Sequence, residues 1–313
     1  METKKKITGA VWLFTALILI YEIVSVLAWT TDIFEGITIK QNILLSQSLI
    51  FVPTVIYLVL RRKNINEIIR FRKFHPLSLL ILPILLIAME PCVVLINAIS
   101  MLFVENQISD VASALVGSNS IWVSLFFMAF LPCVVEELAY RGVMLGSFRD
   151  AGRIKAILAS GLLFGLMHMN LNQMAYAIFI GIVFGLVVEA TGSIIPTMIL
   201  HFLFNGLSVV MQHLSNVVPA LQSEAEDTVL TKGTLLMMIH AYLPFAIIGA
   251  VIAYGCIVLL AWLNKRKDSF LAMFPEPFHQ YDSNGEKIKI FIPLLTVVVC
   301  YCLIRCVVTE FFF

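Results

Sequence analysis

Two adjacent glutamates and an arginine, Glu136, Glu137 and Arg141, lie at the far end of a strongly apolar stretch. Placing a carboxylate in hydrocarbon costs about 2.5–3.5 kcal/mol even on lenient insertion scales, so a pair of carboxylates indicates a functional site. Adjacent carboxylates repel each other, and such pairs supply general acids or bases near neutral pH. Glu137 and Arg141 share a helix face, so we expect an ion pair between them. Glu136 points about 100° away and is expected to face a cavity.

Two further polar clusters interrupt the apolar segments that follow. His168 ends a Phe-x-x-x-His pattern, and His201 and Asn205 are four residues apart on one helix face. The helix that carries Glu136 and the helix that carries His168 are expected to be joined by a turn near residue 152, midway between these two residues. In an antiparallel pair that rises about 1.5 Å per residue, these two side chains lie at the same depth. A carboxylate and an imidazole at one level share a proton or hold a water molecule between them.

A carboxylate, two imidazoles and an amide are compatible with two kinds of hydrolytic site. In one, Glu136 activates water, and an amide or imidazole stabilises the oxyanion that forms at a peptide bond. In the other, Glu136, His168, His201 and Asn205 bind a zinc ion that activates the water. The chain has no His-Glu-x-x-His and no Gly-x-Ser-x-Gly near these clusters, which argues against the usual zinc and serine proteases. A structural role also stays open, in which the charges anchor a helix end and the histidines join helices.

The chain that must position these groups has the composition of a membrane protein. Of its 313 residues, 60% are hydrophobic and 13% are charged, against roughly 25% charged in soluble domains. We expect an all-α, polytopic integral membrane helix bundle that forms a single domain over residues 1–313, because runs of about 20 apolar residues cross a bilayer. The expected spans are 8–28, 42–60, 77–103, 120–141, 156–170, 174–191, 194–214, 235–263 and 290–310. These are nine spans, and the short turn within 156–191 leaves eight as the alternative.

Positive charge alternates from one connecting segment to the next. Lysines and arginines gather at Lys4, Lys5, Lys6, Arg61, Arg62, Lys63, Arg70, Arg72, Lys73, Arg149, Arg153, Lys155, Lys265, Arg266, Lys267, Lys287 and Lys289. The intervening segments carry the acidic residues Asp32, Glu35, Glu105, Asp110, Glu224, Glu226 and Asp227. The positive-inside rule then places the N-terminus in the cytoplasm. The short loops favour a bacterial plasma membrane, and a net charge of +1 gives no indication of nucleic-acid binding.

Glu90, Asn97 and Glu189 are further polar residues in apolar segments. Glu90 and Asn97 either line the cavity or hold the bundle together. Glu189 is close to the end of its span, where we expect it at the membrane interface because that placement costs less than burial. The six cysteines lack the spacing of a disulfide framework or a metal knuckle, so packing roles are expected for them.

Three motifs follow one another on successive apolar segments. They are Glu-Glu-x-x-x-Arg at 136–141, Phe-x-x-x-His at 164–168 and His-x-x-x-Asn at 201–205. In this order they resemble the CPBP family of intramembrane proteases (Abi, or CAAX protease and bacteriocin-processing proteins), to which the Ras-converting CAAX endopeptidase also belongs. Each motif alone is weak, but together they form a specific match over about 120–210, the expected catalytic core. The flanking spans match only in being hydrophobic.

The resemblance implies an intramembrane endopeptidase that cleaves a membrane-associated peptide or protein substrate. It implies that Glu136 activates water with help from His168, and that His201 and Asn205 are oxyanion or metal-site groups. The family is described both as metal-dependent, with a divalent ion such as zinc, and as glutamate-dependent without a metal. The remaining motif residues, which take supporting roles, are Glu137 and Arg141.

Two other classes of function stay open. A membrane scaffold or bacteriocin-immunity protein would keep the motifs without proteolysis. A proton-coupled transporter would use the polar groups as ion sites, but the chain shows no internal repeat of the kind that many transporters carry. The oligomeric state is left open, and the expected partners are the lipid bilayer and the substrate. In a bacterial membrane, peptide maturation, self-immunity or processing of an envelope protein fits better than cleavage of prenylated CAAX proteins.

Overall fold

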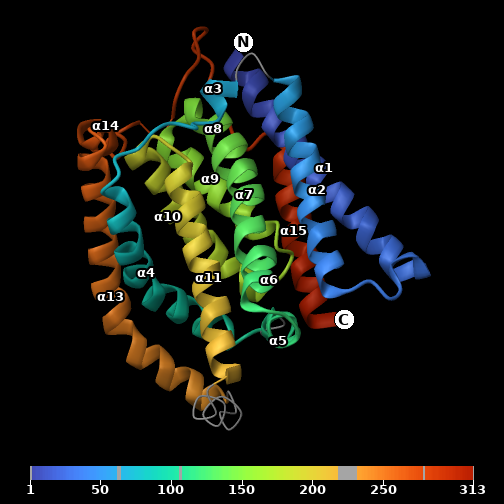
Figure 1. The fold of residues 1–313 in the computed structure, drawn as a ribbon. Coiled ribbons are helices and arrows are strands. Elements are labelled where there is room, and N and C mark those ends of the chain that lie inside the picture. The colour runs from blue at the N-terminus through green and yellow to red at the C-terminus, as the bar shows by residue number, and fades with distance from the viewer. Residues whose placement is uncertain (1, 62–64, 106–107, 218–230, 278, 313) are drawn as a thin grey trace.

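Long helices make up most of the chain in the computed structural model, which describes residues 2–61, 65–105, 108–217, 231–277 and 279–312 (Figure 1). The α-helices are α1 (Glu2–Thr30), α2 (Ile39–Leu60), α3 (Ile65–Ile68), α4 (Ser78–Ser100), α5 (Ile108–Ser118), α6 (Ile121–Leu125), α7 (Leu131–Glu137), α8 (Leu145–Phe148), α9 (Arg153–Leu166), α10 (Leu171–Thr191), α11 (Ile195–Val217), α13 (Lys232–Leu263), α14 (Lys267–Leu271) and α15 (Pro293–Phe312). Two π-helical turns, η3 (Phe126–Phe130) and η4 (Leu138–Met144), and two 3₁₀ turns, η1 (Asp32–Phe34) and η5 (Arg149–Ala151), complete them.

Eight helical stretches in the described part of the chain are long and apolar enough to cross a membrane. They are α1, α2, α4, the continuous stretch Ile121–Ala151, α10, α11, α13 and α15. The predicted all-α polytopic membrane bundle is thereby confirmed, with eight spans by length and composition. The expected span at 156–170 corresponds to α9, which has only 14 residues. Such a helix rises about 21 Å and falls short of a hydrocarbon core of about 30 Å.

The short helix α9 therefore begins at one end of the bundle and ends inside it. It starts after Gly152, whose φ of 113° is a conformation that glycine adopts easily, so the predicted turn near this residue is present. Its far end leads through Met167 to His168, and α10 then returns toward the same end of the bundle. An incomplete crossing is what places His168 within the bundle rather than at its surface.

Glycines let α9 and α10 pack with their backbones in close contact. A Cβ added to Gly181 would lie 2.7 Å from the Cα of Gly161, a distance that real Cβ atoms do not reach. A Cβ on Gly165 would lie 2.9 Å from the carbonyl oxygen of Met174. Small residues at helix interfaces are the usual means of close approach in membranes. Gly161, Gly165 and Gly181 thus allow the close packing of α9 against α10.

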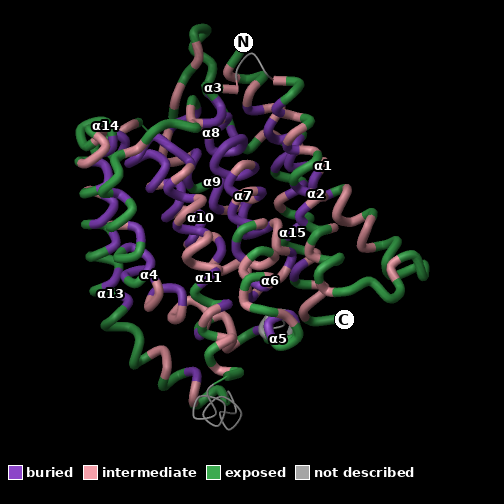
Figure 2. Tube along the Cα trace, in the orientation of Figure 1, coloured by how far each residue is buried: buried purple, intermediate pink, exposed green. Residues whose placement is uncertain are grey.

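The two chain termini lie at opposite ends of the bundle (Figure 1). The N-terminus shares its end with α3, α8 and α14, which carry or adjoin the basic segments. Buried residues concentrate in the centre, on α7, α9 and α10, whereas α13 and the distal part of α1 are largely exposed to their surroundings (Figure 2). Of the charges used to predict orientation, Arg62, Lys63, Glu224, Glu226 and Asp227 lie outside the described residues.

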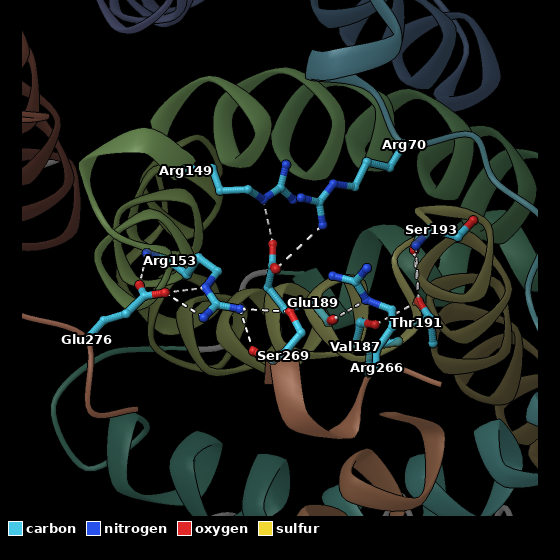
Figure 3. A network of polar contacts seen from close by, with 10 residues as sticks. All are labelled: Arg70, Arg149, Arg153, Val187, Glu189, Thr191, Ser193, Arg266, Ser269 and Glu276. Atoms are coloured by element: carbon cyan, nitrogen blue, oxygen red, sulfur yellow. Dashed lines mark hydrogen bonds and ion pairs between the residues drawn. The ribbon is translucent and has the colours of Figure 1, made fainter. Parts of the chain in front are cut away.

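Glu189 is buried in a cluster of arginines near that basic end (Figure 3). Its carboxylate accepts from Arg149 Nε at 2.6 Å and from Arg70 Nη1 at 3.5 Å, and its backbone carbonyl accepts from Arg266 Nε at 3.0 Å. Glu189 thus lies near the end of its helix, as expected, and its side chain is buried there against other segments of the protein. Burial of one carboxylate is favourable here because cations from three separate segments surround it.

The arginines around Glu189 are partly desolvated and repel one another. Burial, followed by the charge of Arg149, lowers the pKa of Arg70 to about 10, against the opposing effect of Glu189. Burial also lowers the pKa of Arg266, again with Glu189 opposing. The carboxylate of Glu189 thus joins the 61–77 connection and the end of the Ile121–Ala151 stretch to the end of α10, and its backbone carbonyl adds the start of α14.

Candidate functional site

The glutamate pair lies where regular α-helix changes to a π-helical turn. Glu136 and Glu137 are the last residues of α7, and η4 begins at Leu138 and contains Arg141. A second π-helical turn, η3, precedes α7. Single π-helical turns inside α-helices are frequent at functional sites, because the wider turn changes the direction in which side chains project.

Glu137 and Arg141 form a completely buried ion pair, as their spacing predicted. Arg141 Nη1 lies 3.0 Å from Glu137 Oε1. The guanidinium lies over the ring of Phe164 at 4.3 Å and over that of Phe184 at 5.1 Å from the ring centroids. Cation–π contacts of this kind stabilise a guanidinium that has lost its water. Glu137 and Arg141 therefore occupy the packed interior beside the cavity.

His201 connects the buried ion pair to Glu136. Its Nδ1 lies 3.0 Å from Glu137 Oε1, and its Nε2 lies 3.8 Å from Glu136 Oε2. The Glu137 carboxylate paired with Arg141 can only accept, so Nδ1 of His201 carries the proton and donates it. The remaining nitrogen, Nε2, is thereby oriented toward Glu136. A charged second partner that fixes the tautomer of a histidine in this way is a recurring feature of functional sites.

His168 is oriented by the backbone of the helix that precedes it. Its Nδ1 lies 2.8 Å from the carbonyl oxygen of Phe164, and its ring packs edge-on against the Phe164 ring at 5.0 Å. A carbonyl oxygen only accepts, so Nδ1 donates, and the neutral imidazole keeps its lone pair on Nε2. Phe164 thus contacts Arg141, His168 and His201 together, which explains the position of phenylalanine four residues before the histidine.

Glu136, His168, His201 and Asn205 all line one cavity of about 450 Å³. The side chain of Glu136 keeps 12% exposure, whereas that of Glu137 has none. The prediction that Glu136 faces a cavity at the depth of His168 agrees with this placement. The complete lining, drawn from α2, Ile121–Ala151, α9, α10 and α11, consists of Ile43, Ser46, Gln47, Phe127, Met128, Pro132, Glu136, Phe164, His168, Gln173, Tyr176, Ala177, Ile180, His201, Phe204, Asn205 and Ser208.

Asn205 is held by the helix that carries the glutamates. Its Nδ2 donates to the carbonyl oxygen of Met128 at 3.0 Å. The orientation of His201 is fixed by Glu137, and the described contact of Asn205 is to Met128. A primary amide has a second N–H and a carbonyl oxygen, which remain for contact with a bound molecule.

The segment that carries these groups matches a known family. Residues 118–207 match the family model of type II CAAX prenyl endopeptidases, Rce1-like. This segment is an Rce1-like domain. The matched residues include all three motifs, and the family predicted from them is confirmed. No curated protein and no solved structure matches the chain. The match supports a CAAX-type intramembrane protease in general terms.

The cavity of the Rce1-like domain is completed by a residue from outside the matched segment. Gln47 of α2 donates from Nε2 to Glu136 Oε1 at 3.0 Å. Its own Oε1 is buried, and no hydrogen-bond partner for it lies among the residues that the structure describes. Gln47 was not among the residues predicted from the sequence. The signal that identifies it is the Ser-Gln-Ser run at 46–48, a polar interruption of an otherwise apolar span.

The oxygen and nitrogen atoms around the cavity of the Rce1-like domain are of types that bind zinc, but in this structure they do not surround one common position. Within the described ranges, no three His, Cys, Asp or Glu side chains are close enough together to hold a metal ion. Zinc sites in proteins require three or four converging ligands. The metal site expected at Glu136, His168, His201 and Asn205 therefore stays a prediction.

Glu90 and Asn97 do not line the cavity of the Rce1-like domain. Asn97 Oδ1 accepts a hydrogen bond of 2.9 Å from Asn172 Nδ2, which ties α4 to the beginning of α10. Of the two roles considered for these residues, holding the bundle together is the one observed for Asn97.

Proposed function

We propose that this protein is a membrane endopeptidase in which Glu136 is the general base that activates water. The observation that carries the proposal is the asymmetry of the glutamate pair. Glu137 is neutralised by Arg141 and His201 in the interior, while Glu136 faces the cavity beside two oriented histidines. A positioned base within reach of a water molecule contributes about 10²–10⁴-fold to the rate of such a step.

Water is placed between Glu136 and His168 in this reaction. The carboxylate of Glu136 takes one proton from the water, and the lone pair on Nε2 of His168 accepts a hydrogen bond from the same molecule. The water oxygen then bonds to the carbonyl carbon of the peptide, and that carbonyl oxygen becomes an oxyanion. The C–N bond breaks when the protonated Glu136 returns its proton to the departing amine. Atoms and charges balance, because one water molecule adds across one peptide bond.

Groups on α11 stabilise the oxyanion in the same proposal. The free N–H of Asn205 donates to the oxyanion, and Met128 holds the amide in place for this contact. His201 contributes from Nε2 once that nitrogen is protonated, and the Glu137 carboxylate stabilises the resulting imidazolium through Nδ1. Removing one such donor costs about 10²–10³-fold in other hydrolases.

We infer a substrate that is held at the membrane, because the cavity lies among membrane-crossing helices. The matched family model is named for prenylated CAAX substrates, and an unprenylated membrane peptide is the alternative that fits a bacterial membrane.

The decisive comparison is between membrane peptides from cells that carry the wild type and cells that carry Glu136→Ala. A peptide that accumulates uncut only in the variant identifies the bond, and its mass reports a prenyl group. Equal peptide profiles at equal protein levels support a scaffold instead.

The basic end of the bundle faces the cytoplasm in this proposal, as in other membrane proteins with positive connecting segments. A cysteine introduced at Lys73 is then expected to react with an impermeant maleimide in inverted vesicles and not in intact cells. A cysteine at Glu35, near the other end of α2, is the matched control and should show the opposite pattern. Labelling of position 73 from outside intact cells would reverse the orientation.

Gln47 is expected to orient Glu136. In Gln47→Leu, the hydrogen bond of 3.0 Å to Glu136 is lost, and cleavage should fall about tenfold because one such bond contributes roughly 1–1.5 kcal/mol. The measurement is kcat and KM on the peptide identified above. Asn42→Leu, at an exposed position of the same helix and away from the cavity lining, is the control and should keep its rate within twofold. A change in KM alone would assign Gln47 to substrate binding.

A further inference from the structure

A second hollow of about 340 Å³ lies on a different side of α9 from the cavity of the Rce1-like domain. The two share no lining residue. This hollow, called the basic groove below, lies between α9 and the extended segment that precedes α15. Its lining residues are Lys155, Leu158, Ala159, Leu162, His279, Lys287, Ile288, Lys289, Ile290 and Phe291.

The mouth of the basic groove concentrates positive charge. Lys155 Nζ lies 3.4 Å from His279 Nδ1, and Lys287 Nζ lies 3.0 Å from His279 Nε2, so two ammonium groups flank one imidazole. Ammonium groups only donate, and cationic groups gathered at one place attract an anion that accepts from them. Burial, and next the charge of Lys287, lowers the pKa of Lys155.

No carboxylate takes part in the lining of the basic groove. The nearest acidic residues in the sequence, Asp282 and Glu286, both form ion pairs with Lys4 of α1. Lys289 adds a third ammonium group on the same extended segment as Lys287. The lining of the groove is therefore cationic.

The walls of the basic groove become apolar away from its mouth. On α9, Lys155, Leu158 and Leu162 follow one another at three- and four-residue spacing, a stripe about 10 Å long that runs from the basic end toward the membrane interior. On the facing segment, Phe291 comes two residues after Lys289 and leads into α15. Leu158 and Phe291 are each 46% exposed, so the apolar part of the groove is open for contact. Both walls thus change from cationic to apolar in the same direction.

We propose that the basic groove binds an anionic phospholipid, with its phosphate between Lys155, Lys287 and Lys289 and one acyl chain along Leu158 and Leu162. Basic pockets at the cytoplasmic side of helix bundles bind acidic lipid headgroups, each lysine near the surface contributing to the attraction. The apolar stripe adds the burial of acyl methylene groups, which a soluble phosphate does not have. A bound lipid would bridge α9, which carries Phe164, to the segment that leads into α15.

The test measures lipid bound to the purified full-length protein by native mass spectrometry, with phosphatidylglycerol and phosphatidylcholine of identical chains added at equal concentration. The wild type is expected to retain phosphatidylglycerol in preference to phosphatidylcholine. In Lys287→Gln/Lys289→Gln, the affinity for phosphatidylglycerol should fall about 10- to 30-fold, while that for phosphatidylcholine stays unchanged. The control Lys73→Gln/Lys267→Gln removes two exposed lysines at the same end of the protein, outside the groove, and should behave as the wild type.

Three results would overturn the proposal. They are equal retention of the two lipids by the wild type, an undiminished preference in Lys287→Gln/Lys289→Gln, and equal losses in the test and control variants. A further arm adds glycerol phosphate, which has the headgroup charge without chains. Full displacement of phosphatidylglycerol by millimolar glycerol phosphate would make the groove a phosphate site and refute the lipid. Thermal unfolding in phosphatidylcholine verifies that each variant is folded.

Discussion

Glu136→Gln is expected to reduce peptide cleavage by about 10²–10⁴-fold while leaving the protein folded. Glutamine has nearly the same volume as glutamate and keeps an oxygen that accepts from Gln47 Nε2, so the cavity wall should stay in place. What disappears is the group that takes a proton from water. The measurement is single-turnover cleavage by equal amounts of folded protein, because this separates the chemical step from binding and product release.

Glu90→Gln is the matched control for this prediction. Glu90 is also a carboxylate within a membrane-crossing helix, but it does not line the cavity, so its variant should cleave within about twofold of the wild type. A second comparison uses His168→Asn, which removes the lone pair at Nε2 and is expected to lower the rate without loss of folding. Full activity in Glu136→Gln, or equal losses in Glu136→Gln and Glu90→Gln, would refute Glu136 as the base.

Local geometry allowed part of the candidate site to be predicted from the sequence. The four-residue spacing of Glu137 and Arg141 is enough to bring them together, and the observed ion pair is an intrahelical contact. The alignment of Glu136 with His168 followed from counting residues on either side of one turn, which the structure places at Gly152. Both inferences depend on one helix or one hairpin, whose geometry is nearly constant.

Residue spacing does not predict contacts between helices that are distant in the sequence. His201 joins Glu137 and Glu136 because α11 packs against α7 at one particular rotation and height, which no spacing within either helix determines. Gln47 reaches Glu136 from α2, 89 positions earlier in the chain. The expected span at 156–170 also included residues 167–170, which the structure shows as the turn from α9 into α10.

Glu189 shows the same limit for charge. For a glutamate considered by itself near the end of a span, the free energy is lower at the membrane interface than in the membrane interior. Three arginines from distant segments make burial of the carboxylate less costly, because their guanidinium groups lose water when the segments pack and are then stabilised by its negative charge. The burial of Glu189 therefore results from the tertiary fold, and the arginine-rich connections that predicted membrane orientation also have a structural role.

Glu189→Gln is accordingly expected to destabilise the protein by about 3–5 kcal/mol, the usual cost of removing one partner from a buried charge cluster. Arg70 and Arg149 would then face each other without a carboxylate between them. Unfolding in detergent, followed by tryptophan fluorescence against temperature and against added dodecyl sulfate, measures the loss. Activity per folded molecule should stay unchanged, because the cavity lining does not include Glu189.

Glu276→Gln provides the contrast that separates a buried cluster from an ordinary ion pair. Glu276 pairs with Arg153 at 2.5 Å, but their side chains are 27% and 18% exposed, so its removal should cost no more than about 1 kcal/mol. Adding Arg149→Gln to Glu189→Gln removes one of the unpaired cations and should restore part of the stability, with a coupling of about 0.5–3 kcal/mol. Two results would contradict this role of Glu189. One is a Glu189→Gln variant as stable as the wild type, and the other is a double variant whose loss of stability equals the sum of the losses in Glu189→Gln and Arg149→Gln alone.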